Sequence, residues 1–371
     1  MKFMKKNFLR VLAIVLTVAM LVTVMVTAPT VAFAEEAPKD TASQMAVDED
    51  YGDYVIYVAN SGVSNKATKS AEVSLDGYSA TVDKIDAKEG KLLWNDGKGT
   101  LNFNFTVPET ALYNLKIVWK PVAKGVNINV GIKIDGEYLF DGTQNAVLSR
   151  LWKNVSDEPR TDAQGNQYSQ EQVETGTKIE TYLSDTTGLI AEPYTFALTA
   201  GAHTITFVEP DQSFEIYGIS FVAPEATQSY ETVSGSYNLQ EVADAPIITI
   251  QGEAAEIKSS SSIIPKSNNS DASMTPRNAY TMKINYLGGT SWQMPGEEVT
   301  WKFNVEKAGY YSLNFRCKQS DLVNGESFRW LKIDGKTPFD EAKNITFAYD
   351  TGWKYETFQN EETPYYFYLD K

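Results

Sequence analysis

Few residues of this chain have the chemistry of a catalytic or metal centre. The sequence contains one histidine, His203, and one cysteine, Cys317. A single histidine excludes a histidine cluster around zinc and disfavours a Ser–His or Cys–His nucleophile. Both residues lie in alternating segments, "AHTITF" and "YYSLNFRCK", so we expect two strand residues, the cysteine partly buried. A glycosidase pair of carboxylates stays open, because acidic residues are abundant and no pair stands out.

Aromatic residues offer a different chemistry. The chain has 7 Trp, 21 Tyr and 17 Phe. A flat aromatic ring can stack on the apolar C–H face of a sugar, whose hydroxyls then need polar partners. Most of these rings must be core, and we expect Trp94 and Trp292 to be structural. Trp152 and Trp353 differ, because each sits at a strand end beside a basic residue, where a loop departs. These two positions favour sugar recognition.

The elements that position these residues form an internal repeat. The segment "WNDGKGTLNFNFTVPETALYNLKI" (94–117) aligns without gaps with "WQMPGEEVTWKFNVEKAGYYSLNF" (292–315). Further pairs are "IKIDGEYLFD" (132–141) with "LKIDGKTPFD" (331–340), and "EPYTFAL" (192–198) with "TPYYFYL" (363–369). We also align Trp152-Lys153 with Trp353-Lys354. The chain therefore contains two copies of one unit, in register.

Each copy is predicted to be all-β. Short alternating runs are separated by Gly, Pro, Asn and Asp turns, and no long amphipathic helix is evident. The Asp-Gly pair in both "IDG" segments predicts a tight turn with positive φ. These features favour two tandem β-sandwiches. The expected parts are a signal peptide (1–34), an acidic linker (35–50), a first sandwich (51–224), a polar linker (225–245) and a second sandwich (246–371).

The two copies differ after their last shared strand. In the first copy "EPYTFAL" is followed by "TAGAHTITFVEPDQSFEIYGISFV", which predicts two further strands. In the second copy only Asp370 and Lys371 remain. We therefore expect a C-terminally truncated chain whose second sandwich is incomplete, with an unpaired edge and an open core.

A long insertion distinguishes the first copy. From Trp152 to Pro193 the first copy advances 41 residues, whereas the second advances 11 from Trp353 to Pro364. The extra segment, 154–188, is polar and nearly free of apolar periodicity. Long loops on rigid sandwiches often carry binding functions, so we expect a site here. A decorative surface insertion is the open alternative.

The N-terminus predicts export. Four basic residues, an apolar run and "AFA" before Glu35 are typical of a secretory signal peptide cleaved after Ala34. An uncleaved anchor helix is the alternative. Cleavage would remove four positive charges and change the net charge from −15 to −19. Such an acidic surface repels the phosphates of nucleic acid, so we expect no nucleic-acid partner. We expect a secreted, cell-surface-associated protein.

With these motifs in order, the repeat resembles bacterial carbohydrate-binding modules with the galactose-binding-like jelly roll. The segments "IDGEYLFD", "SRLWKN", "RTDAQGNQ" and "EPYTFALTAGAHTI" more closely resemble the tandem N-terminal domains of large extracellular solute-binding proteins. Those proteins serve sugar-type ABC transporters of Gram-positive bacteria. The resemblance implies a non-catalytic module that binds an oligo- or polysaccharide. It also implies a membrane permease partner, contacted through lobes downstream of the tandem domains.

The resemblance also implies site residues. In such modules the sugar pocket lies in loops at one end of the sandwich. The contacts there are a loop tryptophan, matched by Trp152 and Trp353, and a polar residue of the final loop, matched by Gln212 in "EPDQSFE". The candidate contacts are Arg150, Trp152, Arg160, Tyr182, Gln212 and Trp353. A structural calcium is the only cofactor implied, with Glu253 in "IQGEAAE" as a ligand. The first copy departs from this pattern, since "IYVANSG" lacks the matching acid and Tyr217 replaces an expected Asp.

Two other functions stay open. The chain fits an ancillary carbohydrate-binding region of a secreted polysaccharide-degrading enzyme. It also fits a structural spacer at the cell surface without a sugar site.

Overall fold

The structure, a computed structural model, describes residues 46–81, 85–88, 90–95, 98–239 and 246–371. The expected signal peptide (1–34) and most of the acidic linker lie outside the described residues. Among the helices of the described part, none is long and apolar enough to cross a membrane.

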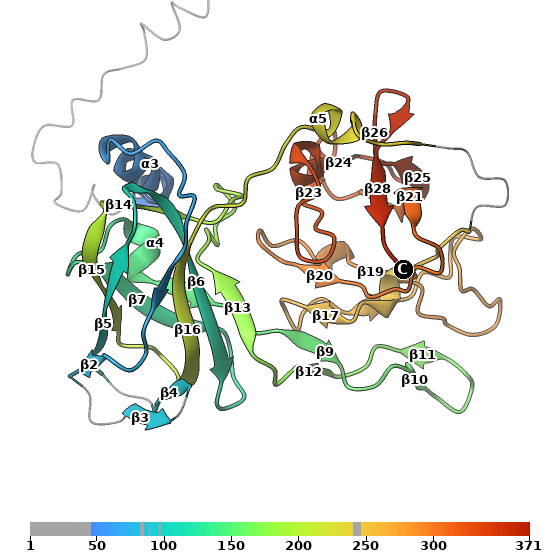
Figure 1. Ribbon diagram of the computed structural model, residues 1–371. Coiled ribbons are helices and arrows are strands. Elements are labelled where there is room, and N and C mark those ends of the chain that lie inside the picture. The colour runs from blue at the N-terminus through green and yellow to red at the C-terminus, as the bar shows by residue number, and fades with distance from the viewer. Residues whose placement is uncertain (1–45, 82–84, 89, 96–97, 240–245) are drawn as a thin grey trace, which may run out of the picture. The chain divides into compact units, whose positions relative to one another are not determined.

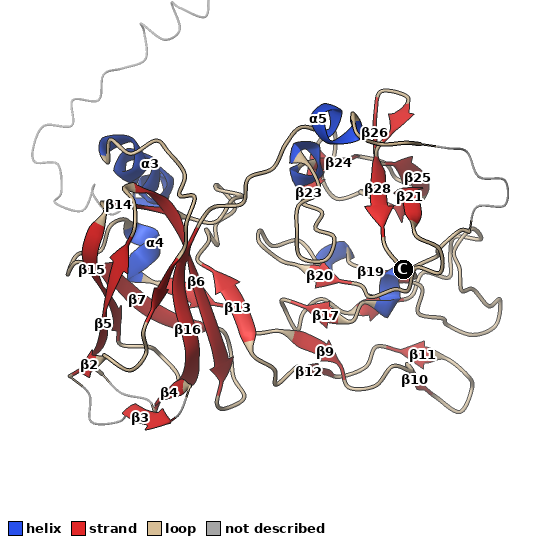
Figure 2. Ribbon diagram, in the orientation of Figure 1, coloured by secondary structure: helices blue, strands red, loops and turns tan. Residues whose placement is uncertain are grey.

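Two antiparallel sheets form a sandwich in the first copy (Figures 1 and 2). Among the described residues, one sheet has seven strands: β1 (Ala71–Val73), β3 (Ile85–Lys88), β4 (Lys91–Trp94), β6 (Ala111–Pro121), β13 (Ile179–Tyr182), β14 (Thr195–Leu198) and β16 (Phe214–Val222). The other has five: β2 (Ser79–Ala80), β5 (Thr100–Val107), β7 (Ile128–Ile134), β8 (Ala146–Leu148) and β15 (Gly201–Val208). The prediction of an all-β sandwich fold is confirmed.

The alternation seen in the sequence determines which side chains face the interior. Along β5, Leu101, Phe103, Phe105 and Val107 are at most 5% exposed, and the residues between them are half-buried or exposed. Successive strand residues point to opposite faces, so one face of β5 packs into the core. Stacked and edge-to-face aromatic pairs fill the space between the sheets, among them Phe105 on Phe221 at 4.4 Å.

A helix that sequence reasoning missed covers the edge of β14. Residues Ala46–Asn60 form α3, where we expected the end of the acidic linker and the start of the first sandwich. Tyr54 and Tyr57, one turn apart on α3, accept hydrogen bonds from the backbone N–H groups of Thr195 (2.9 Å) and Ala197 (2.8 Å). These bonds satisfy donors that β6, on the other side of β14, cannot reach. The helix therefore protects an otherwise open sheet edge.

The second copy repeats the geometry of the first. β23 (Glu326–Arg329) and β24 (Ile345–Ala348) pair with Arg329 opposite Ile345, as Val130 pairs with Ala146 in the first copy. Both Asp-Gly turns have positive φ, with 53° at Asp135 and 51° at Asp334. The turn prediction is thus confirmed. The one-turn helix α4 (Asp141–Gln144) has its counterpart in the 3₁₀ helix η3 (Asp340–Lys343).

Helix α5 (Tyr230–Ser234) caps a strand edge in the second copy, as α3 does in the first. The hydroxyl of Tyr230 accepts a 3.0 Å hydrogen bond from the backbone N–H of Tyr366. Its ring lies edge-on to Phe339 at 4.9 Å, the separation that also relates Tyr54 to Phe140. This part of the expected linker 225–245 is therefore packed against the second copy.

The strands of the second copy are short. Among the described residues, three antiparallel pairs of four-residue strands form there: β21 (Gly309–Ser312) with β28 (Tyr366–Leu369), β22 (Asn314–Cys317) with β25 (Lys354–Thr357), and β23 with β24. The buried core is small and consists of Phe339, Ala342, Ile345, Phe358, Tyr365 and Phe367. Minor elements are η1 (Gly252–Ala254), η2 (Gly289–Ser291), β18 (Pro265–Lys266), β19 (Tyr286–Leu287), β26 (Gln359–Asn360) and β27 (Thr363–Pro364).

The insertion of the first copy is built into a sheet. Together with Trp152 and Lys153 before it, the insertion forms β9 (Trp152–Asn154), β10 (Arg160–Thr161), β11 (Gln167–Tyr168) and β12 (Gln172–Glu174). β9 and β12 join β17 (Ile257–Lys258) and β20 (Val299–Thr300) in one four-stranded sheet (Figure 1). The fully buried Lys258 donates a 2.7 Å hydrogen bond from Nζ to Asn154 Oδ1. The insertion is thus an edge-pairing element, and not the free loop that its polarity suggested.

Candidate functional site

A buried arginine organises the loops at one end of the first sandwich. Arg150 is 1% exposed, and its guanidinium donates to the carbonyls of Ala123 and Val126. It also donates to Glu174 Oε2 at 2.7 Å and to Gln212 Oε1 at 2.8 Å. Charge-assisted bonds of this kind are strong where water is excluded. Arg150 therefore ties three loops and β12 together.

Gln212 completes this network from the final loop. Its Nε2 donates to the carbonyls of Val126 and Asn127 at 3.1 and 3.0 Å. Gly125 permits the close approach, because a Cβ at that position would lie 2.4 Å from Gln212 Oε1. The sequence predicted that Gln212 and Arg150 lie at the same end, and the structure brings them together. The polar groups of Arg150 and Gln212 bind each other and the backbone, so these two residues stabilise the loops and do not present free groups to a ligand.

Trp152 and Tyr182 face the same cavity. Trp152 opens β9 and is half-buried, whereas Tyr182 ends β13 and is 41% exposed. Both line the cavity together with Ser149 and the exposed Glu180. Arg160 lies elsewhere, exposed on β10 opposite Tyr168, and does not line this cavity. Of the predicted contacts, Trp152, Tyr182 and Trp353 line this cavity, whereas Arg160 does not.

Trp353 is not the structural counterpart of Trp152. β25 pairs with β22 so that Lys354 lies opposite Cys317, and β13 pairs with β6 so that Ile179 lies opposite Trp119. Cys317 and Trp119 are equivalent in the repeat, so Lys354 corresponds to Ile179. The two Trp-Lys pairs therefore match by chance. The 27 positions from Trp152 on β9 to Ile179 on β13 have no equivalent in the second copy. Trp353 packs edge-on against Tyr286 at 5.6 Å.

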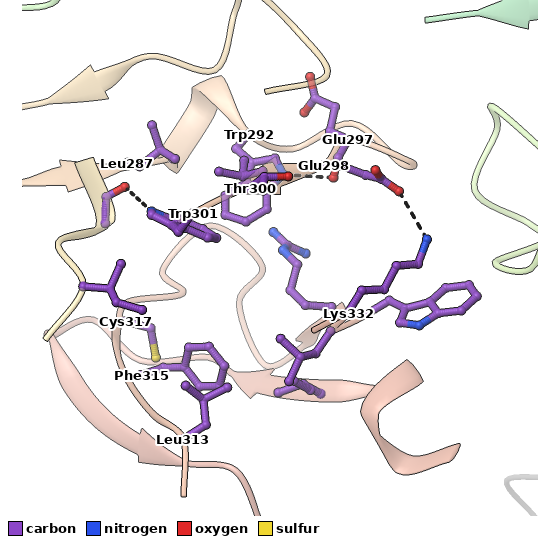
Figure 3. A pocket seen from close by; sticks show the side chains of 18 of the residues that line it. Leu287, Trp292, Glu297, Glu298, Thr300, Trp301, Leu313, Phe315, Cys317 and Lys332 are labelled. Atoms are coloured by element: carbon purple, nitrogen blue, oxygen red, sulfur yellow. Dashed lines mark hydrogen bonds and ion pairs between the residues drawn. The ribbon is translucent and has the colours of Figure 1, made fainter. Parts of the chain in front are cut away.

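The cavity extends through the interior of the second copy. Its volume is about 4190 Å³, several times the roughly 300–1,000 Å³ of ordinary ligand pockets. Trp292, Trp301, Leu313, Phe315 and Cys317 surround it (Figure 3). A space of this size with a mainly apolar lining is an open core, and not a pocket shaped around one small molecule.

Polar contacts at the cavity rim hold two tryptophans by their ring nitrogens. Trp292 donates from Nε1 to the carbonyl of Glu297 at 3.2 Å, and Trp301 donates to that of Gly252 at 3.0 Å. Arg329 lies over the ring of Trp292, 4.8 Å from its centroid, and burial lowers the pKa of this arginine. The ring N–H groups of both tryptophans are therefore used in protein contacts, and Arg329 covers one face of Trp292.

Glu253 does not fit a calcium site. It lies on η1, and its Oε2 is buried without a hydrogen-bond partner among the described residues. Burial raises the pKa of this carboxyl group, which favours its neutral form. Calcium takes six to eight oxygen ligands, several of them charged. No group of three acidic, histidine or cysteine side chains suitable for a metal occurs within the described ranges.

The single histidine and the single cysteine occupy strands, as predicted. His203 lies on β15, with Nδ1 2.7 Å from Asp135 Oδ2 and Nε2 2.7 Å from the carbonyl oxygen of Thr199. Cys317 ends β22 and is half-buried, and burial raises the pKa of its thiol to about 11. Such a thiol is a poor nucleophile near neutral pH.

No protein-family model matches the chain, and no curated protein matches it. Among solved structures, it is similar to a Podospora anserina GH26-CBM35 β-(1,4)-mannanase (TM-score 0.22, 15% identity, 43% of this chain and 26% of that chain). It is also similar to a Phanerochaete chrysosporium exo-β-1,3-galactanase with galactose (0.25, 12%, 42% and 29%) and to a GH87 α-1,3-glucanase catalytic domain with nigerose (0.25, 10%, 43% and 29%).

These comparisons correct one expectation. The chain was expected not to be an enzyme, yet the matched solved structures are named as polysaccharide-degrading enzymes. The non-catalytic assignment is therefore wrong as stated. The chain spans less than a third of each of these structures, at TM-scores of 0.22 to 0.25. Similarity this low transfers no catalytic residue to this chain.

Proposed function

We propose that the first sandwich binds an oligo- or polysaccharide on the cavity wall that carries Trp152 and Tyr182. The supporting observation is the placement of these two rings. They come from β9 and β13, face one cavity, and lie beside the polar Ser149 and Glu180. Aromatic faces next to hydrogen-bonding groups suit the two-sided chemistry of a pyranose.

The buried network beneath the wall supports this role. Arg150 lies two residues before Trp152, and its ion pair with Glu174 joins the start of β9 to the end of β12. A wall fixed in this way loses little conformational entropy when a sugar binds. Each stacked ring contributes on the order of 1 kcal/mol, so we expect dissociation constants of roughly micromolar to millimolar size.

The proposal includes the biological setting implied by the sequence. The protein would be exported by its N-terminal signal and act at the cell surface as part of a solute-binding protein for sugar uptake. Its partner would be a membrane permease. The basic and apolar N-terminus and the tandem-domain resemblance support this setting.

The test is a glycan array followed by NMR titration of the full chain. Trp152→Ala and Tyr182→Ala should each weaken binding about fivefold or more, since each removes a stacking face. Arg160→Ala is the matched control, because Arg160 lies in the same insertion outside the cavity wall, and it should bind like the wild type. Equal binding by all four proteins would move the site elsewhere. Absence of binding by the folded wild type would favour a structural spacer.

A second candidate is an ancillary region of a secreted polysaccharide-degrading enzyme, the class to which the matched structures belong by name. Binding with release of reducing sugar from the same glycan would favour this candidate. Binding without release would favour the uptake function.

A further inference from the structure

One hairpin completes the core of the first sandwich. β15 pairs with β5 and β7 in one sheet, and β16 pairs with β4 and β6 in the other. The hairpin thus places a central strand in each layer. Its inward side chains are all 0% exposed: Ile205, Phe207, Phe214, Ile216, Ile219 and Phe221.

Aromatic contacts show which residues of β4, β5 and β6 pack against this hairpin. The pairs are Phe221 on Phe105 (4.4 Å), Phe207 on Phe103 (6.2 Å), and Phe214 on both Trp94 and Trp119 (6.3 Å each). The four receiving residues lie on β4, β5 and β6. Each is at most 5% exposed, because the hairpin covers it.

The residues of the second copy that correspond to these four aromatic residues line its cavity. At the constant spacing of the repeat they are Trp292, Trp301, Phe303 and Cys317. Phe303 is 40% exposed, whereas its counterpart Phe105 is 5% exposed. Figure 3 shows Trp292, Trp301 and Cys317 directed toward the open space. The cavity therefore lies where the first copy holds β15 and β16.

The backbone on this side of the second copy is open as well. Among the described residues, β21 pairs only with β28 and β22 pairs only with β25. Their counterpart β6 pairs with β16 in addition to β13 and β14. Unpaired strand edges beside an apolar surface are the features that accept an added strand.

We propose that the cavity of the second copy is a docking site for a β-hairpin that carries apolar residues at alternating positions of both strands, as β15 and β16 do. One strand adds to β21 and β22, and the other adds to the layer of β20. The alternate Ile and Phe side chains then cover Trp292, Trp301 and Phe303. This proposal does not rest on the sugar-binding proposal, although the wall around Trp152 belongs to the same cavity.

The test uses the hairpin of the first copy as the probe. A duplicate of residues 201–222 is fused directly after Lys371, so that Asp370 and Lys371 provide the two-residue spacing that Thr199 and Ala200 provide in the first copy. Cys317 is the single cysteine and reports on the cavity through its reaction with N-ethylmaleimide. We expect the fusion to slow this reaction at least tenfold and to shift tryptophan emission to shorter wavelength.

A matched control separates docking from mere proximity. In the control, the duplicated hairpin carries Asn at the positions of Ile205, Phe207, Ile219 and Phe221, and it should change the reaction rate less than twofold. An unchanged rate with the wild-type hairpin, or equal protection by the control, would overturn the proposal. A dimer of the unfused chain in which Cys317 is already protected would also overturn it, since the occupant would be a second copy.

Discussion

Replacing Arg150 with Met tests whether this residue is an internal tie or a ligand contact. The change removes a 1%-exposed guanidinium and leaves Glu174, whose side chain is only 14% exposed, without its cation. Removal of one partner of a buried ion pair costs about 3–5 kcal/mol. Because Glu174 keeps some access to water and still accepts from the backbone N–H of Gly125, we expect the lower end, about 3 kcal/mol. For a sandwich of this size that corresponds to a fall in Tm of about 6–12 °C.

Differential scanning calorimetry of the full chain measures this loss. Arg160→Met is the control, because Arg160 lies nearby in sequence, in the insertion, and its exposed side chain has no hydrogen-bond partner among the described residues. It should change the free energy of unfolding by less than about 0.5 kcal/mol. A loss of less than 1 kcal/mol for Arg150→Met, together with abolished glycan binding, would refute the reasoning. Arg150 would then be a ligand contact and not a tie.

Two further changes probe neighbouring contacts. Gly125→Ala should cost about 1 kcal/mol, because the new Cβ displaces Gln212 Oε1 from Arg150, whereas Gly77→Ala meets open space and should be neutral by urea unfolding. Burial lowers the pKa of Lys258 from 10.5 to about 8, so the unfolded chain binds more protons between these pH values and wild-type stability rises with pH there. Lys258→Met should therefore exceed the wild type in stability at pH 7 by a margin that narrows from pH 8 to pH 10. A margin independent of pH would contradict the burial of a charged Lys258.

The fold class and the repeat were determined by the sequence because both depend on local preferences. Alternation along β5 predicts a strand with one buried face, since successive side chains point to opposite sides whatever the partner strand is. Asp135 and Asp334 adopt the predicted positive φ because an Asp-Gly pair tolerates it locally. The constant spacing between the copies likewise follows from the residues alone.

Helix α3 escaped prediction for a related reason. Its short apolar run also suits a strand, and its helical spacing of Tyr54 and Tyr57 becomes meaningful only when β14 lies beneath them. A residue pattern that suits two elements is decided by the surface on which it packs.

The candidate site was decided by the tertiary structure. Sequence placed Arg150, Trp152 and Gln212 at one end of the sandwich, but long-range contacts determine which side chains become buried. Arg150 donates to Gln212, which is 62 positions away in the chain. The residues adjacent to Arg150 in the sequence therefore could not show that it binds other protein groups and not a ligand. Strand register, set by pairing with β22, likewise separates Trp353 from Trp152. Local patterns specify strands and turns, whereas burial and register arise only when distant segments meet.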